Sequence, residues 1–430
     1  MATTVNAPTS GKGPSLLKRP AVVRLLLIAL LAETGYAVMN LTTMQHYLRD
    51  ERQFGAGTIG LVVVAFLLSE ALFKSPMGHL SDRIGPKRLM LIGPSLSVFT
   101  AFGSLLVPKT GGTFPELLAF LGLRTIDGLG AAMLWPAAFT AVSDAVEDGE
   151  RQEAMSYLNL CYMVGIAIAF GVGGAANDLT HTKYAGMVLA GILFLAVSIC
   201  VWRLVPEISK GHGQVEKEGE GSLSGLKASL KQIPTYLLLS LITFAGIGFP
   251  LAIFTLFPSD QFHMSQSMIG ALVLPCALGM GAASVPMSRL GERIGRSNAV
   301  HLGLGLAAAG MWIIAVAAFI PPLRQAWIFA LCGIPLGIGF LLAIPAWMAS
   351  VSDINPQCRG ANLGAVMTAQ GIGAIIGAPI GSFLYEKMQP VGTSLGLGHA
   401  FGRYSPFVGC AACLTFGFVL SLHILRDAKR

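Results

Sequence analysis

Five ionisable side chains fall inside long apolar stretches of this 430-residue chain: Glu33, Glu70, Lys74, Arg124 and Asp127. All five belong to the amino-terminal half, and the carboxyl-terminal half has none at comparable depth. A charge within a membrane is costly, and such residues commonly mark proton relays or ion pathways. The pattern therefore indicates proton handling by Glu33, Glu70, Arg124 and Asp127, confined to one half of the chain.

Glu33 is the strongest single candidate for carrying a proton. It lies near the middle of the first apolar stretch and has no oppositely charged residue within four positions. Burial disfavours the ionised carboxyl, which suits a group that must bind a proton and release it. Two alternatives remain open: a hydrogen bond to a neighbouring helix, or an ion pair with Arg124, which would instead favour the ionised form.

The other four residues form two pairs at helical spacing. Glu70 and Lys74 are four positions apart, so an internal ion pair is the favoured interpretation and direct proton coupling is the alternative. Arg124 and Asp127 are three positions apart and share roughly one helix face, so they can also pair. For these two residues, both a coupling role and a purely structural ion pair are open.

The elements that position these residues are membrane spans. The chain is 53% hydrophobic and only 12% charged, against about 25% charged in soluble domains. A span needs about 20 mostly apolar residues. Twelve stretches qualify: 22–46, 58–78, 89–108, 115–140, 153–176, 184–204, 235–257, 267–288, 299–320, 325–349, 360–385 and 405–425.

An internal repeat divides these stretches into two sets of six. The ten residues Pro76–Gly85 return 210 positions later as Pro286–Gly295 with six identities. We therefore expect an amino-terminal bundle over 1–204, a cytoplasmic linker over 205–233 and a carboxyl-terminal bundle over 234–430. Parallel repeats of this kind are typical of transporters.

Basic residues predict the orientation. Only seven of the 29 Lys and Arg residues fall in the odd-numbered loops: Arg49, Arg52, Lys109, Lys183, Arg324, Lys387 and Arg403. Two more lie inside spans, and the others lie at the termini or in even-numbered loops. The positive-inside rule then places both termini in the cytoplasm, in a multi-pass protein of the plasma (inner) membrane. This topology also explains the net charge of +7, so no nucleic-acid partner is expected.

The residues Gly78-His-Leu-Ser-Asp-Arg-Ile-Gly-Pro-Lys-Arg88 resemble the cytoplasmic loop signature of the major facilitator superfamily, Gly-x-Leu-x-Asp-Arg-x-Gly-x-Lys/Arg-Lys/Arg. The resemblance implies an all-α integral membrane protein with twelve transmembrane helices in two pseudo-symmetric six-helix bundles. It also implies a conformational latch made by Gly78, Asp82, Arg83, Gly85 and Arg88. A purely topogenic role for the arginines is the alternative.

Two further patterns point to the drug:proton antiporter-like branch of this superfamily. Arg124-Thr-Ile-Asp-Gly-Leu-Gly130 is similar to Arg-x-x-Gln-Gly-x-Gly, whose arginine is implicated in proton coupling, although Asp127 replaces the usual Gln. The antiporter pattern Gly-x-x-x-Gly-Pro-x-x-Gly-Gly resembles Gly165–Gly174, but Ala169 and Phe170 replace its Gly-Pro. This departure weakens the assignment to antiport.

In the resembled family, spans 1, 4, 5, 7, 10 and 11 face a central cavity. Polar and aromatic residues on these spans are therefore candidate substrate contacts, and packing between helices is the alternative for each. The candidates are Asn40, Tyr157, Tyr162, Trp347 and Gln370.

Signatures of enzymes are absent from the sequence. There is no phosphate-cradling Gly-Lys-Ser/Thr loop, no metal-ligand spacing and no Gly-x-Ser-x-Gly elbow, so we expect no catalytic, metal or cofactor site. The expected function is secondary active transport of a small organic, amphipathic or hydrophobic compound by a monomer among membrane lipids. Proton-coupled export is favoured. The alternatives are import of a small metabolite by symport or uniport, lipid transport and, least favoured, a receptor that transports nothing.

Overall fold

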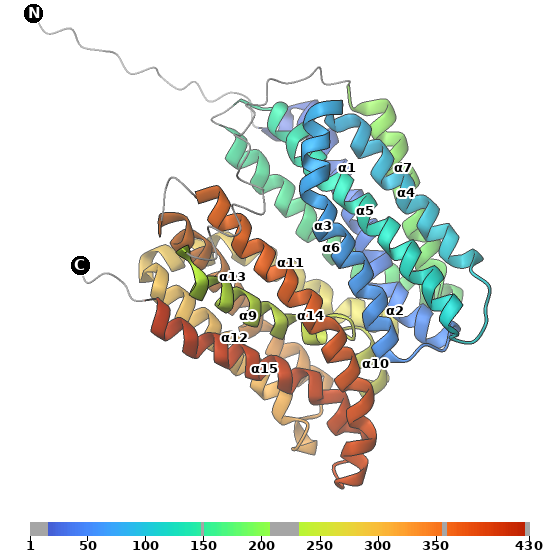
Figure 1. Cartoon of the computed structure of the whole chain (residues 1–430), viewed down its shortest axis with the longest axis vertical. Helices are drawn as coiled ribbons and strands as arrows, with labels where there is room; N and C mark the ends of the chain where they lie inside the picture. The colour runs from blue at the N-terminus through green and yellow to red at the C-terminus, as the bar shows by residue number, and fades with distance from the viewer. Residues whose placement is uncertain (1–15, 148–149, 207–231, 355–358, 426–430) are drawn as a thin grey trace, which may run out of the picture.

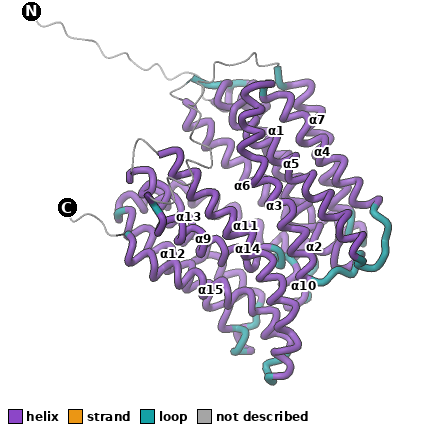
Figure 2. The backbone as a smooth tube through the Cα atoms, viewed as in Figure 1, coloured by secondary structure: helices purple, strands orange, loops and turns teal. Residues whose placement is uncertain are grey.

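The computed structural model describes residues 16–147, 150–206, 232–354 and 359–425, and within these ranges it is helical, with no strands. Figure 2 shows the helices joined mainly by short loops. The elements are η1 (Leu16–Lys18), α1 (Pro20–Ala37), η2 (Val38–Thr43), α2 (Met44–His46), η3 (Tyr47–Glu51), α3 (Ala56–Ile84), α4 (Pro86–Leu106), α5 (Phe114–Asp144), α6 (Arg151–Thr180), α7 (Ala185–Leu204), α9 (Pro234–Leu251), α10 (Leu256–Phe262), α11 (Gln266–Ile294), α12 (Arg296–Val316), η5 (Pro321–Leu323), α13 (Ala326–Ile354), α14 (Arg359–Ser394) and α15 (His399–Ile424).

Within these described residues, 12 helical stretches are long and apolar enough to cross a membrane. They match the twelve predicted spans in order, so the predicted number of spans is confirmed. The helices run further than the apolar stretches do. In particular, α14 continues to Ser394 and α15 begins at His399, because polar residues at the ends of a span extend the helix beyond the hydrocarbon region.

This extension corrects the placement of some basic residues. Arg49 and Lys387 lie on helices η3 and α14, and Arg403 lies in the first turns of α15, whereas the sequence placed all three in loops. Arg52 follows η3 directly and is almost fully buried, with 1% exposure. The predicted seventh span also differs, because α9 ends at Leu251 and a separate helix, α10, follows.

The first span is not a uniform α-helix. After α1 it passes through η2 and η3, both of which are π-helical, on either side of the short α2. Single π-helical turns inside α-helices are rare, and many of those that are known lie at functional sites. The segment η2 contains Asn40, one of the predicted substrate contacts, so the irregular backbone coincides with a candidate site residue.

The spans pack as two bundles, α1–α7 and α9–α15, coloured blue to green and yellow-green to red in Figure 1. In the first bundle α3 and α4 pack on α5, and α1 packs on α6. In the second, α14 packs on α9, and α12 packs on α13. Between the bundles, the main helix pairs are α3 with α14 and α6 with α11. This is the predicted fold of two six-helix bundles.

The internal repeat is visible in the glycines between helices. Gly85 joins α3 to α4 with a φ of 91°, and Gly295 joins α11 to α12 with a φ of 88°. A side chain would strain the backbone in that region, so glycine is required at both turns. After the first turn, Pro86 begins α4, at a helical position where its missing N–H costs no hydrogen bond.

Close helix approach repeats as well. A methyl group added at Gly93 on α4 would lie 2.5 Å from the carbonyl oxygen of Gly130 on α5, and one at Gly303 on α12 would lie 2.5 Å from that of Gly339 on α13. Small residues allow helices to pack this closely in lipid. The same glycine contact therefore joins corresponding helices in both bundles.

The described contacts between the bundles lie mainly towards one side of the molecule. Because consecutive spans alternate in direction, α1 begins and α15 ends on one side, here called the termini side, and α3 and α11 begin on the other, the far side. A methyl group at Gly60, near the start of α3, would lie 2.7 Å from Ser382 Oγ on α14. In Figure 1 the ribbons of the bundles diverge towards the termini side.

Candidate functional site

Glu33 lies on α1 and is 5% exposed. Its side chain fits against α6 because residue 165 is glycine: a methyl group there would lie 2.8 Å from Glu33 Cβ. Tyr162, one turn earlier on α6, has its hydroxyl close enough to the Glu33 carboxyl for the two groups to interact. Glu33 is thus held between two residues of α6, one small and one polar.

The charges that act most on Glu33 are those of Glu70 and Lys74 on α3. These two residues form the ion pair predicted by their spacing, with Lys74 Nζ 2.9 Å from Glu70 Oε1. The Lys74 side chain is 51% exposed and that of Glu70 is 20% exposed, so the pair lies at the edge of the buried region, with its lysine towards the surroundings.

Arg124 and Asp127 on α5 form a separate ion pair, in which the Arg124 Nη2 group donates to Asp127 Oδ2. The same Nη2 lies 2.8 Å from Asn40 Oδ1 on η2, and Thr100 Oγ1 on α4 donates to Asp127 Oδ1 at 3.1 Å. The Arg124 guanidinium also lies 5.3 Å from the centre of the Phe66 ring. Three helices and η2 therefore meet at this pair.

Both members of the Arg124–Asp127 pair are fully buried, with 1% and 0% side-chain exposure. Among the described residues, Arg124 Nη1 has no hydrogen-bond partner. Breaking a buried pair of this kind leaves an uncompensated charge, which is strongly unfavourable. The pair predicted from the sequence is therefore present, and it retains one unused donor.

The alternative in which Glu33 pairs with Arg124 is wrong for this structure. No ion pair joins these two described residues, because Arg124 is engaged by Asp127 and Asn40. Tyr36 on α1 is buried in the same region and interacts electrostatically with Asp127, Glu70 and Glu33. Its hydroxyl is bonded to Ser97 Oγ at 2.9 Å.

The balance of charge in this polar interior is uneven. Among the described residues, Asp127 pairs with Arg124 and Glu70 pairs with Lys74, but no ion pair includes Glu33. A buried carboxylate without a cationic partner is unfavourable, whereas a neutral carboxyl at the same place is tolerated. The site can therefore accommodate one exchangeable proton at Glu33 without disturbing the two ion pairs.

The predicted substrate contacts do not form one cluster. Asn40 joins the Arg124 group through its side chain, and Tyr162 faces Glu33 and packs edge-on against Trp135 at 5.1 Å between ring centroids. Tyr157 is half-buried against the core of the first bundle. These three residues belong to the amino-terminal bundle.

Trp347 and Gln370 belong to the other bundle. Trp347 on α13 is 1% exposed inside an apolar cluster, and Gln370 on α14 is half-buried. In the described part of the chain neither Trp347 Nε1 nor Gln370 Nε2 has a hydrogen-bond partner. Each bundle thus has at least one buried donor without a partner.

The predicted latch lies at the turn between α3 and α4. A methyl group at Gly78 would lie 3.7 Å from Pro136 Cβ on α5, so this glycine faces α5. Arg83 and Arg88 are exposed, and Gly85 makes the turn itself. The side chain of Asp82 lies outside the described part of the structure, so its predicted role remains a prediction.

Sequence reasoning missed a buried ion pair on the far side. Arg52 Nη1 lies 2.9 Å from Glu116 Oε1 at the start of α5, and both side chains are 1% exposed. Arg52 also donates to the Tyr47 hydroxyl at 2.6 Å, and Glu116 accepts the backbone N–H of Gly112 at 3.1 Å. The partners are 64 positions apart, so no local spacing could have revealed them.

Comparison with known proteins agrees with this architecture. A family model described as Major Facilitator Superfamily matches residues 25–378 and 236–429. The chain is similar to the uncharacterized MFS-type transporter YceJ of Bacillus subtilis (strain 168), with 24% identity over 371 residues, 84% of this chain and 89% of that protein. It is also similar to Multidrug resistance protein 2 of the same organism, with 24% identity over 339 residues, 76% of this chain and 80% of that protein.

Solved structures show the same fold. A crystal structure of a mutant of the nucleoside transporter NupG superposes with a TM-score of 0.75 at 16% identity, covering 93% of this chain and 99% of that one. A bacterial homologue of the human lysosomal transporter Spinster, in an inward-facing and unoccupied conformation, gives 0.74 at 16% identity, covering 97% and 100%. The chain, an integral multi-pass membrane protein and not an enzyme, belongs to the major facilitator superfamily of secondary transporters.

Proposed function

We propose that this transporter exports a small amphipathic or hydrophobic organic compound in exchange for protons, with Glu33 as the proton carrier. The observation that carries the proposal is the charge balance: in the described part of the chain Glu33 forms no ion pair, while Glu70 and Asp127 each form one.

Protonation of Glu33 changes the energy of the buried site substantially. Placing an unpaired charge at the centre of a span costs about 2.5–3.5 kcal/mol on insertion scales, so the neutral carboxyl suits the closed, buried arrangement. The Tyr162 hydroxyl can donate to the ionised carboxylate when the proton has left. Both forms of Glu33 are thereby accommodated, as an exchange of one proton per cycle requires.

The other acids have supporting roles in this proposal. The Arg124–Asp127 pair fixes η2 through Asn40, so a change in the pair is transmitted to the first span beyond Glu33. Glu70 and Lys74 set the field at Glu33. We therefore assign proton coupling to Glu33 with Glu70, Arg124 and Asp127 around it.

Names of similar proteins support the substrate class. Besides Multidrug resistance protein 2, the chain is similar to the quinolone resistance protein NorA of Staphylococcus aureus (strain MSSA476), with 25% identity over 230 residues, 53% of this chain and 56% of that protein. The packed aromatic pair of Tyr162 and Trp135 and the buried donor of Trp347 suit a compound with apolar and polar parts.

The position of the contacts between the bundles supports alternating access. The far side is closed by contacts between the bundles, and most Lys and Arg residues lie on the termini side. By the positive-inside rule we assign the termini side to the cytoplasm, in the plasma (inner) membrane, so the contacts on the far side are the ones that must open for export. We propose that a single chain performs the cycle among membrane lipids, since many large apolar side chains are exposed on its spans.

The test is lumenal pH in proteoliposomes that are made acidic inside. Lipophilic cations, neutral drugs, small acids and sugars are added outside to the wild type, to Glu33→Gln and to a matched control, Glu51→Gln. Glu51 is an acid on the far side that pairs with Lys109 within the same bundle, so its loss leaves the interior unchanged.

Proton antiport predicts that one compound class raises the lumenal pH with the wild type and Glu51→Gln but not with Glu33→Gln. A fall in lumenal pH on substrate addition would indicate symport and overturn the proposed export. Transport without any change in lumenal pH would refute the proton coupling. Transport of lipid alone would refute the proposal that the substrate is a small organic compound. Retained pH dependence in Glu33→Gln would refute the role of Glu33.

A further inference from the structure

One ion pair joins the two bundles directly on the far side. Arg49 Nη1, at the end of the first span, lies 2.6 Å from Asp260 Oδ1 on α10, 211 positions later. The other carboxylate oxygen of Asp260 accepts the Tyr385 hydroxyl of α14 at 2.7 Å. Arg403 Nη1 of α15 donates to the Asp260 backbone carbonyl at 2.6 Å. Donors from three spans therefore hold Asp260 in place, and one of them belongs to the opposite bundle.

Two more acids cross between the bundles in a symmetric way. Glu386 on α14 accepts the backbone N–H of Gly57 in the first turn of α3, at 3.0 Å. Asp178 on α6 accepts the backbone N–H of Ser267 in the first turn of α11, at 2.7 Å. The helices α3 and α11 are repeat equivalents, and so are α6 and α14. Each bundle thus supplies an acid to the helix start of the other.

These contacts favour closure for a simple electrostatic reason. The first N–H groups of a helix lack partners within the helix, and the helix dipole places partial positive charge there, so a carboxylate at that position is stabilising. When the bundles separate, the Arg49 guanidinium and the backbone N–H groups of Gly57 and Ser267 lose their carboxylate partners at the same time. The arrangement therefore ties closure of the far side to Asp178, Asp260 and Glu386.

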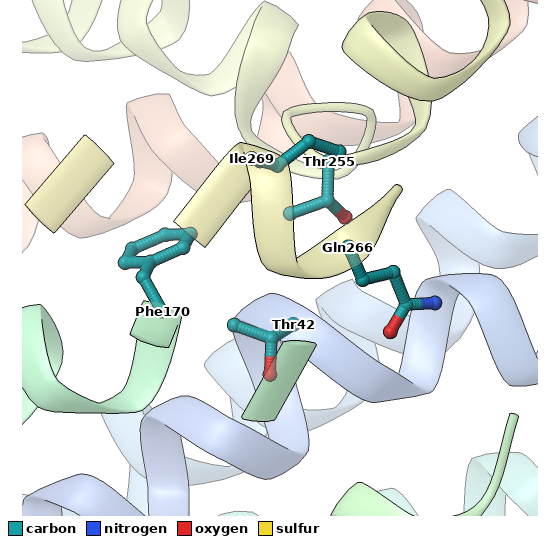
Figure 3. Close-up of a pocket in the computed structure, with 5 residues that line it drawn as sticks. All are labelled: Thr42, Phe170, Thr255, Gln266 and Ile269. Carbon is teal, nitrogen blue, oxygen red and sulfur yellow. The ribbon is translucent and has the colours of Figure 1, made fainter. Parts of the chain in front are cut away.

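Inside the same contact, the polar groups are only partly satisfied. Figure 3 shows Thr42 and Phe170 of one bundle facing Thr255, Gln266 and Ile269 of the other around a narrow gap, which has no room for a water molecule. Asn177 Nδ2 donates to Gln266 Oε1 at 2.6 Å. Among the described residues, however, the buried Gln266 Nε2 and Thr255 Oγ1 have no hydrogen-bond partner. Such groups gain partners when water enters, so their burial opposes closure.

We propose that Asp178, Asp260 and Glu386, with Arg49 and the starts of α3 and α11, form an outer gate that holds the far side closed and opens for substrate release. The gate rests on the alternating access of the proposed function. Two opposing contributions set the stability of the closed gate. Carboxylate contacts at the rim hold the bundles together, and unsatisfied polar groups inside favour opening. Weakening the rim must then expose the interior of the contact to the far side.

The test uses a thiol introduced inside the contact by Thr255→Cys, a position that is 3% exposed. Purified protein in lipid nanodiscs is treated with a membrane-impermeant maleimide, and the same protein without Thr255→Cys gives the background from the native cysteines. The rim is then weakened by Asp260→Asn, or by Glu386→Gln together with Asp178→Asn. Ile269→Cys, at another buried position lining the gap, serves as a second reporter.

A matched control is available on the same side of the molecule. Lys109 Nζ lies 2.6 Å from Glu51 Oε2 within the amino-terminal bundle, the same separation as between Arg49 and Asp260. Glu51→Gln removes that ion pair without touching the contact between the bundles. Any change in labelling that reflects surface charge in general appears in this control as well.

We expect Asp260→Asn to raise the labelling rate of the introduced thiol roughly fivefold, as the loss of one partly exposed ion pair implies, with a larger rise in the Glu386→Gln/Asp178→Asn protein. Glu51→Gln should label like the parent. Equal labelling of Asp260→Asn and Glu51→Gln at both reporters would overturn the gate. If Asp260→Asn does not give monodisperse protein, Arg49→Gln removes the same contact between the bundles from its other partner.

The labelling experiment requires neither substrate nor a proton gradient. Faster labelling in the rim variants, together with retained pH dependence in Glu33→Gln, would support the gate and refute the proposed coupling. Unchanged labelling in the rim variants, together with loss of pH dependence in Glu33→Gln, would refute the gate and support the proposed coupling. The two proposals therefore fail separately.

Discussion

Tyr162 on α6 presents its hydroxyl to the buried carboxyl of Glu33 on α1. The two residues are far apart in the sequence and come together because Gly165 lets α6 approach α1 closely. Tyr162 is predicted as a substrate contact, but its place in the structure connects it to Glu33. Its role can be tested separately from that of Glu33.

Tyr162→Phe should move the pH profile of transport to higher pH. A hydrogen bond to a charged group contributes about 1.5–3 kcal/mol, and its loss makes the ionised Glu33 less favourable, so proton release needs a lower proton concentration. The measurement is the initial rate of substrate-driven proton movement in proteoliposomes at a series of pH values.

The control for this prediction is Tyr157→Phe, which removes a hydroxyl from the same helix away from Glu33. A Tyr162→Phe profile that coincides with that control would show that the hydroxyl does not act on the proton. If instead the profile stays and the KM for substrate rises, Tyr162 is a substrate contact, as the sequence suggested.

Arg124 and Asp127 should behave as one unit in unfolding experiments. Arg124→Gln leaves the fully buried Asp127 without its cation, at a cost of about 3–5 kcal/mol. The double variant Arg124→Gln/Asp127→Asn removes both charges and should cost less than the single one. Denaturant unfolding of purified protein measures the difference, and Lys74→Gln at the more exposed pair should cost only about 0–1 kcal/mol.

An additive double variant, in which the two losses of stability sum, would contradict the pairing. Transport assays on the same proteins then separate structure from coupling. A double variant that is stable but no longer coupled to protons assigns the pair to coupling, and one that is stable and still coupled leaves it a structural ion pair.

Much of the fold could be predicted because its signals are local or periodic. Apolar runs revealed the twelve spans, and the repeat of Pro76–Gly85 at Pro286–Gly295 revealed the two bundles. The turn glycines of these motifs appear in the structure with the same left-handed backbone. Spacings of three and four residues likewise predicted the Arg124–Asp127 and Glu70–Lys74 pairs.

The remaining features depend on distant parts of the chain. The Arg49–Asp260 pair spans 211 positions and Arg52–Glu116 spans 64, and neither leaves a pattern in one sequence. Hydropathy also placed Arg403 in a loop, because the helix extends past the apolar run. The π-helical turns of η2 and η3 have no sequence signal that separates them from an α-helix.

Gly165→Ala should be far more damaging than the same substitution at Gly171. Both glycines lie on α6, but an added methyl group would sit 2.8 Å from Glu33 Cβ at position 165 and 3.9 Å from the nearest atom at position 171. The first contact forces α1 and α6 apart or displaces Glu33, at about 1–3 kcal/mol. Thermal unfolding in detergent compares the two variants directly.

Transport gives a second readout for Gly165→Ala, because a displaced Glu33 carries protons poorly even in folded protein. We expect a reduced proton flux per substrate transported, with Gly171→Ala close to the wild type. Equal melting temperatures and equal coupling in the two variants would contradict the close contact between Gly165 and Glu33.

Gly85→Ala should impair the turn that positions the predicted latch. Gly85 has a φ of 91°, where an alanine is strained by about 1–2 kcal/mol. Gly78, in the same motif, is a helical residue at which a methyl group would make an ordinary contact of 3.7 Å with Pro136. Gly78→Ala is therefore the matched control, and its stability should stay near that of the wild type.

The latch hypothesis adds a functional consequence to this difference in stability. If the turn holds Asp82 and Arg83 where they brace the termini side when it closes, Gly85→Ala should slow transport by more than its loss of stability explains. Asp82→Asn, which leaves the backbone unchanged, should then slow transport while the protein remains fully folded. If Asp82→Asn turns over like the wild type and only Gly85→Ala is slow, the latch hypothesis is refuted. The motif would then act only as a structural turn, because the backbone alone would account for the effect.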